Sequence, residues 1–235
     1  MFVVVETYVA GGQSATGWFA RVSWQAKLAG IVVLAYVVML FTLYLRLKHL
    51  PGPYYGGDLY AHHGFALNYI ANGFWSDPYF VGHYSFYPWL GNYLFIFLSI
   101  LPGVSLMQAE NFVGILTTIL SAFAFWMLGM QVFKNRTWAL VLVLLSLATR
   151  GIPSGAPNLV PWMITIPFWF AFWLKAGETK SLRDKLLAGL FMGLTSLSHV
   201  AFFLSGISVF FFTIIIETLL KPDKKQAIGD GIKLY

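Results

Sequence analysis

Asp58 and His62 form the most suggestive pair of polar side chains in the sequence, because they lie four residues apart. Residues at i and i+4 share one face of a helix, so the carboxylate can orient the imidazole and share its proton. The same two groups can also supply two ligands to a divalent cation. A purely structural interpretation remains open: Asp58 caps a helix that runs to about Ala71, and His62 lies on its surface.

Further polar residues are candidates to bind or position a substrate. They are His63, His83 and Tyr87, which follow Asp58 in the same stretch, and Arg150, Asn158 and His199, which come later. Histidines and carboxylates that gather on one side of a protein are typical of a functional site. A long polar loop would hold the same residues without any chemistry, and this alternative stays open.

The composition restricts the kind of protein that holds these residues. Of 235 residues, 58% are hydrophobic and only 10% are charged, against about 25% charged in an ordinary soluble domain. Cysteine is absent, which excludes disulfides and thiolate chemistry. The net charge of +6 needs no nucleic-acid partner, because basic cytoplasmic loops give the same sign. We expect an all-α membrane protein, with the lipid bilayer as its main solvent.

Apolar segments predict about six transmembrane helices. A bilayer-spanning helix needs about 20 mostly apolar residues. The candidates are residues 28–45, 112–133, 138–149, 161–174 and 186–220, of which the last is long enough for two helices and breaks at Ser198-His199. Gly189 and Gly193 have a spacing that permits close helix packing. Residues 88–101 are too short to cross readily, and Pro88 and Asn92 favour a short interfacial helix.

Charge counting orients the later loops but not the first one. With six spans, Arg46, Lys48 and Arg150 are the outer basic residues, and the other twelve of the fifteen face the cytoplasm. A seven-span topology with an outer N-terminus gives an equal split. We adopt six spans, with residues 1–27 as a cytoplasmic or interfacial segment, 28–220 as one transmembrane module and 221–235 as a cytoplasmic tail. Both termini are then cytoplasmic, in a multi-pass protein of the cell membrane.

The outer loop over residues 49–109 should contain helices of its own, since a structureless loop of that length is unusual. Asn72-Gly73 would end the helix that Asp58 begins. Its expected apolar face contains Leu59, Ala66 and Ile70. Glu110, together with Asn111, opens the next span, where we expect both side chains to satisfy backbone groups or to lie among lipid headgroups.

The loop also carries a resemblance to a known superfamily. The stretches GGDLYAHHGFALNYIANGFWSDPYF and YSFYPWLGNYLFIFLSILPG resemble the first luminal loop of the C-type membrane glycosyltransferases, which include oligosaccharyltransferase catalytic subunits, protein mannosyltransferases and aminoarabinose transferases. In that superfamily an acidic residue precedes an amphipathic helix, a Tyr-Pro segment and a short helix on the outer surface. GLFMGLTSLSH at residues 189–199 resembles a span that ends at the outer face.

The resemblance implies an inverting transfer of a sugar from a polyprenyl-phosphate donor, with Asp58 as general base. It also implies that His62 or His63 orients Asp58 or holds a phosphate, and that Arg150 and His199 clamp the departing phosphate. His83 and Tyr87 are weaker candidates.

Two departures from the superfamily pattern matter. The second outer loop has no acidic residue, and Asn158 is the nearest substitute; a metal-dependent oligosaccharyltransferase is therefore disfavoured and no cofactor is expected. Family members also continue through more spans. The chain is then expected to be a fragment of such an enzyme, a half that pairs with a second membrane polypeptide, or a relic without activity. The alternative function is accordingly a non-catalytic subunit, or half-module, that pairs with another transferase polypeptide. A transporter is disfavoured, since the spans lack buried charges.

Overall fold

The structure, a computed structural model, describes residues 23–46, 53–80, 82–84, 90–149 and 160–220. Over these ranges the chain is all-α, with eight α-helices, one π-helical turn and an isolated β-bridge between Ser76 and Tyr84. The expected all-α class is therefore confirmed. Tyr87, Arg150, Asn158 and the proposed tail at 221–235 lie outside the described residues, as does most of the proposed segment 1–27.

Each predicted span corresponds to a helix. The elements are α2 (Trp24–Arg46), α3 (Pro53–Asn72), α4 (Leu90–Ser99), α5 (Leu106–Phe133), α6 (Arg136–Thr149), η1 (Pro161–Thr165), α7 (Ile166–Thr179), α8 (Leu182–Ser198) and α9 (Val200–Leu220). The predicted break after Ser198 is confirmed, because His199 adopts an extended conformation between α8 and α9. The short helix expected within 88–101 is α4, with ten residues.

Local capping explains where the long helices begin and end. Ser105 accepts a hydrogen bond from the backbone of Gln108, whose side chain bonds back to the Ser105 N–H, and this capping box starts α5. Lys134 ends α5 in the left-handed conformation, at φ 50°. The Asn135 side chain then accepts from the backbone N–H groups of Thr137 and Trp138 and starts α6. These signals make a tight antiparallel turn between the two helices.

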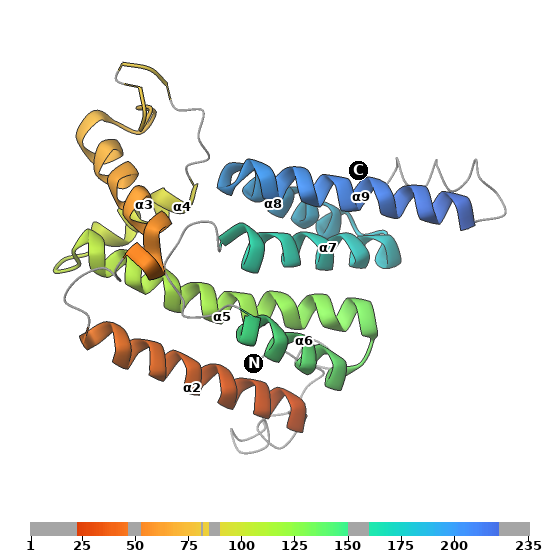
Figure 1. Ribbon diagram of the computed structural model, residues 1–235. Coiled ribbons are helices and arrows are strands. Elements are labelled where there is room, and N and C mark those ends of the chain that lie inside the picture. The colour runs from red at the N-terminus through yellow and green to blue at the C-terminus, as the bar shows by residue number, and fades with distance from the viewer. Residues whose placement is uncertain (1–22, 47–52, 81, 85–89, 150–159, 221–235) are drawn as a thin grey trace, which may run out of the picture.

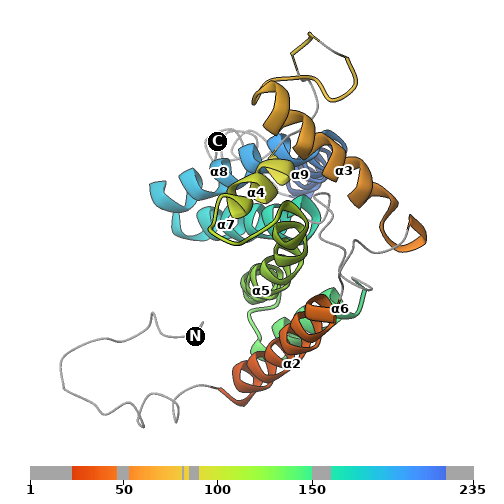
Figure 2. The ribbon, with the colours of Figure 1, turned by 90° about the vertical axis from the view of Figure 1, so that its left-hand side faces the viewer.

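The helix α5 lies between two groups of helices (Figures 1 and 2). On one side it packs against α2 and α6, around a core that includes Trp126, Leu140 and Val143. On the other side it packs against η1, α7 and α8, around a core that includes Met163, Phe168 and Trp169. The α9 helix completes this second group through contacts with α8 and η1.

The long helices alternate in direction, and α3 and α4 lie at one end of the bundle (Figure 1). We call this the α3–α4 end; it holds the start of α5 and the junction of α8 with α9. The opposite end holds the starts of α2 and α6, which a hydrogen bond from Gln25 Nε2 to Thr137 Oγ1 joins at 3.2 Å. At the same opposite end an ion pair of 2.5 Å joins Lys134 to Glu178, near the ends of α5 and α7.

Large apolar side chains cover the outside of the bundle. In the described part of the chain they include Ile31, Leu34 and Val38 on α2, Leu186 and Leu190 on α8, and Leu204, Phe211, Phe212, Ile215 and Leu219 on α9. Among the described residues, α5 is long and apolar enough to cross a membrane, by length and composition only; α2, α4, α6 and α9 contain shorter apolar helical stretches. An apolar exterior of this extent is uncommon for a protein surrounded by water.

Gly189 and Gly193, whose spacing permits close helix packing, have open space around them in the described part of the chain. A Cβ atom added at Gly189 or Gly193 would have no described atom within 4 Å. Close approach occurs instead at Gly129, where an added Cβ would lie 2.7 Å from the Cα of Ala139. The Gly-x-x-x-Gly spacing shows that a helix has a smooth face but not which neighbour that face meets.

Candidate functional site

Polar side chains from three helices meet at the α3–α4 end. The imidazole Nδ1 of His62 lies 2.8 Å from Asn92 Oδ1, which joins α3 to α4. The imidazole Nδ1 of His63 lies 2.8 Å from Glu110 Oε1, which joins α3 to the first turns of α5. Adjacent residues of α3 therefore connect to two different helices, and these contacts help to fix the rotation of α3 about its axis.

His62 belongs to the buried face of α3. Its side chain lies against Phe65 with the rings edge to face, and Phe65, Ala66 and Tyr69 are buried beside it. Ile70 is exposed, at 55% of its surface. The predicted apolar face was thus wrong for Ile70, because aromatic residues lie on both candidate faces of α3 and spacing alone cannot choose between them.

Asp58 lies inside α3, one turn before His62, and does not cap it. The helix begins at Pro53, five residues earlier than predicted. Proline suits a first helical turn, since its missing N–H would have no partner there. The position of the Asp58 side chain is outside the described residues, so the suggested Asp58–His62 pair stays a prediction.

Glu110 is a functional candidate whose environment was wrongly predicted from the sequence. Its side chain is fully buried and paired with His63, rather than lying among headgroups. Asn111 and Asn92 are buried as well. A usable signal was present: Ser105 already caps α5, so Glu110 lies beyond the cap, where a carboxylate entering an apolar helix needs a partner.

Tyr93 of α4 lies on the buried side of the α3–α4 end. Its hydroxyl donates a hydrogen bond to the Phe74 carbonyl, and its ring stacks on that of Phe74 at 4.3 Å between centroids. Burial, together with the nearby Tyr69, raises the pKa of Tyr93 to about 12. The phenol is therefore held neutral, as a structural donor.

His83 lies in the turn after α3, away from the buried pairs. It is exposed, and its carbonyl accepts from the Asp77 N–H at 2.9 Å. The Asp77 carboxylate is itself used to stabilise the turn, accepting from the backbone N–H groups of Tyr79 and Phe80 at 2.8 and 2.9 Å. Neither residue joins the His63–Glu110 pair.

His199 lies at the same end of the bundle, at the junction of α8 and α9 (Figure 1). Its ring packs 4.8 Å from that of Phe202, and its Nδ1 is enclosed without a hydrogen-bond partner among the described residues. An enclosed ring nitrogen of this kind is costly unless a further group or a water binds it.

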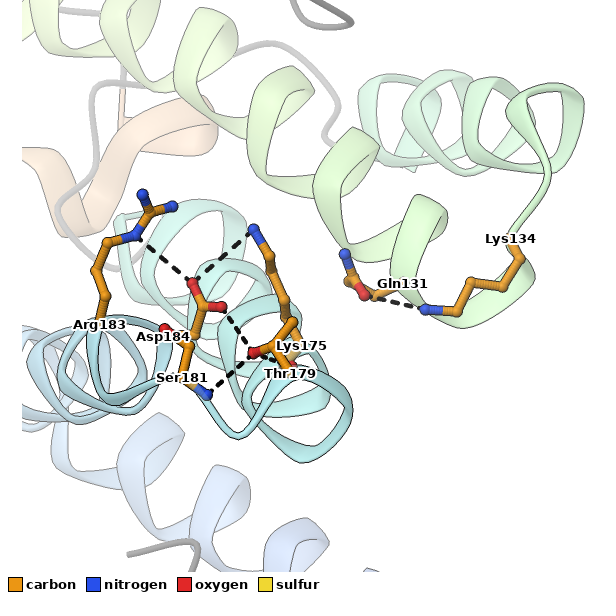
Figure 3. A network of polar contacts seen from close by, with 7 residues as sticks. All are labelled: Gln131, Lys134, Lys175, Thr179, Ser181, Arg183 and Asp184. Carbon is orange, nitrogen blue, oxygen red and sulfur yellow. Dashed lines mark hydrogen bonds and ion pairs between the residues drawn. The ribbon is translucent and has the colours of Figure 1, made fainter. Parts of the chain in front are cut away.

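The opposite end carries basic side chains at the ends of helices, among them Lys134, Lys175 and Arg183 (Figure 3). The buried carboxylate of Asp184 lies 3.8 Å from Lys175 Nζ and 3.8 Å from Arg183 Nε. It also accepts a hydrogen bond from Thr179 at 3.0 Å. The two ends thus differ in charge: histidines and Glu110 at one, and paired cations at the other.

A metal site is not evident in the described ranges, since no three His, Asp or Glu side chains gather there. The arrangement can instead move or hold protons and bind anions through imidazole groups. No protein family model matches the chain, and comparisons with curated proteins and with solved structures give no match either.

Proposed function

We propose that the chain is a multi-pass membrane protein, in which α2, α5, α6, η1–α7, α8 and α9 cross the bilayer and α3 and α4 lie on its outer surface. The alternating directions of these helices support this topology (Figure 1). So do the apolar side chains exposed around the bundle. The ten residues of α4 make it the shortest described α-helix, at about half the length that a crossing takes.

The charge distribution supports an outer location for the α3–α4 end. At the opposite end, the helix termini and the turns between them carry Lys134, Lys175, Lys180, Arg183 and Lys185. Basic loops remain on the cytoplasmic side of a membrane. In this orientation both chain termini are cytoplasmic.

We further propose that the protein transfers a sugar from a polyprenyl phosphate to an acceptor at the α3–α4 end, in the manner of C-type membrane glycosyltransferases. One observation carries this proposal: α3, which contains Asp58, and the α8–α9 junction, which contains His199, lie at the same end of the bundle (Figure 1). A general base and a phosphate-binding group must both reach one sugar.

The proposed reaction is a single displacement. The acceptor's O–H or N–H group attacks the anomeric carbon as its proton passes to the Asp58 carboxylate. The bond between the anomeric carbon and the phosphate oxygen breaks, and the polyprenyl phosphate leaves with that electron pair. One displacement inverts the anomeric configuration. His199, and Arg150 from the second outer loop, would bind the departing phosphate.

The test is Asp58→Asn in membranes supplied with a panel of short-chain polyprenyl-phosphate hexoses labelled in the sugar. We expect loss of transfer by about a hundredfold or more, the usual contribution of a general base. Glu178→Gln is the matched control, since it neutralises an exposed carboxylate at the opposite end. Equal transfer by the wild type and Asp58→Asn would exclude Asp58 as the base.

A non-catalytic subunit is the second candidate function. The observation that favours it is the engagement of both α3 histidines, His62 with Asn92 and His63 with Glu110. This function predicts copurification with a larger membrane protein under mild detergent. A chain that transfers sugar when purified alone would contradict it.

A further inference from the structure

His63 is the described side chain that can neutralise the charge of the Glu110 carboxylate. The side chain is fully buried, and His63 is the ion-pair partner that the described residues supply. Its second oxygen, Oε2, is enclosed and has no hydrogen-bond partner in the described part of the chain. A bare buried carboxylate is strongly unfavourable, so the pair must hold a proton that cancels the negative charge.

Two positions of that proton, both within the hydrogen bond between His63 Nδ1 and Glu110 Oε1, leave Nε2 protonated. When the proton lies on His63 Nδ1, the ring is an imidazolium and Nε2 carries its own hydrogen. When it lies on Glu110 Oε1, the carboxylic acid donates to Nδ1 of a neutral ring, whose single hydrogen is then on Nε2. A third neutral arrangement, with the acid hydrogen on Oε2, would leave that buried O–H without an acceptor among the described residues and is therefore unfavourable. In the two favourable states, Nε2–H is a hydrogen-bond donor.

The side chain that carries this donor is partly exposed. The side chain of His63 keeps 28% of its surface exposed, whereas Glu110 keeps none. Among the described residues, the bond from Nδ1 to Glu110 is the polar contact of the ring. While Nε2 carries a hydrogen it cannot take a proton from an acceptor, so in these two states His63 is not the general base. It suits an anion, whose oxygens accept hydrogen bonds.

We propose that His63 Nε2–H binds a phosphate oxygen at the α3–α4 end, with Glu110 as the positioning residue that keeps Nε2 protonated and fixes the ring. The identification of this anion as the phosphate of the lipid-linked donor rests on the proposed function. The donor state of Nε2 rests only on the His63–Glu110 geometry.

The first measurement uses the wild-type chain in phosphate-free maltoside micelles. Nitrogen NMR of labelled histidine reports whether each ring nitrogen is protonated, and His63 is assigned as the signal that persists when each other histidine is replaced in turn. We expect Nε2 of His63 to be protonated at about pH 7. An unprotonated Nε2 would overturn the proposal without the need for any variant at the pair.

The second measurement titrates the protein with inorganic phosphate and with farnesyl phosphate. We expect binding to weaken about tenfold in His63→Gln and in Glu110→Gln, as for the loss of one charge-assisted hydrogen bond. Lys134→Gln is the control, because it removes a cation from the opposite end. Tighter binding of farnesyl phosphate identifies a lipid ligand and equal binding identifies phosphate alone; both support the site.

Absence of binding, or equal affinity in all variants, would overturn the proposal. Its failure is distinguishable from failure of the proposed function. If Asp58→Asn retains full transfer while His63→Gln loses phosphate binding, the transferase mechanism fails and the phosphate site stands. If Asp58→Asn loses transfer while His63→Gln binds phosphate as the wild type does, the phosphate site fails and the transferase mechanism stands.

Discussion

The indole ring of Trp169 lies against the backbone of Gly206, where α9 approaches η1 and α7. Trp169 is almost fully buried, and a Cβ atom at position 206 would overlap its ring. The glycine is therefore required by packing between helices, in contrast to Gly193, which has open space around it.

Gly206→Ala should destabilise the protein by about 1–3 kcal/mol, the usual cost of overpacking a core. Gly193→Ala is the matched control and should be neutral or stabilising by up to about 1 kcal/mol, since alanine is the better helix former. Circular dichroism during titration of maltoside micelles with a denaturing detergent measures both. Equal effects of the two substitutions would contradict the contact between Trp169 and position 206.

Asp184→Asn should destabilise the opposite end of the bundle by about 2 kcal/mol, because a buried carboxylate loses charge-assisted contacts with Lys175 and Thr179 (Figure 3). Glu178→Gln changes an exposed pair with Lys134 and should cost less than about 1 kcal/mol. The same unfolding titration compares them. A larger loss in Glu178→Gln would show that the network in Figure 3 contributes little.

Stability should fall between about pH 10 and pH 12 because of Tyr93. Its folded pKa is raised from 10.0 to about 12, so over this interval the unfolded chain loses a proton that the folded chain keeps. The contribution of the neutral Tyr93 phenol to the free energy of unfolding is complete below about pH 10, and it is lost as the pH rises through the pKa of the folded state. Unfolding at a series of pH values should give a shallower fall in Tyr93→Phe than in the wild type.

Tyr84→Phe provides the control for that series, since Tyr84 is exposed at 86%. It should follow the wild-type curve throughout. A curve for Tyr93→Phe parallel to that of the wild type would exclude Tyr93 as the cause.

The topology predicts opposite accessibility for two single cysteines, in a chain that has none of its own. Ala61→Cys, on the exposed side of α3, should react with an impermeant maleimide in intact cells. Leu182→Cys, exposed at the start of α8, should react only after the membrane is opened. Labelling of both cysteines from one side would exclude the alternating arrangement across a membrane.

The sequence predicted the helices well because the signals for them are local. The apolar run that ends before Lys134 and the break at Ser198-His199 coincide with helix ends in the structure, whereas α7 continues to Thr179, past the predicted end at residue 174. The shortness of the apolar run around Asn92 likewise predicted a separate short helix. Such features need no knowledge of which helices are neighbours.

The partners within the site were not predictable in the same way. Spacing suggested a pair between Asp58 and His62, whereas the structure joins His63 to Glu110, 47 residues away in sequence. Which of two adjacent histidines faces α5 depends on the rotation of α3, and that rotation follows from the burial of Phe65 and Tyr69 against α4. Only the packed structure contains that information.

The central place of α5 has a consequence for the order of assembly during synthesis. Its partners α2 and α6 are complete once Thr149 has been made, while α7, α8 and α9 arrive later and cover the remaining face. The hydroxyls of Thr117 and Ser121, both buried in the complete bundle, donate to carbonyls of α5 itself. These two groups therefore need no partner from the later helices, which suits a half-built bundle in an apolar medium.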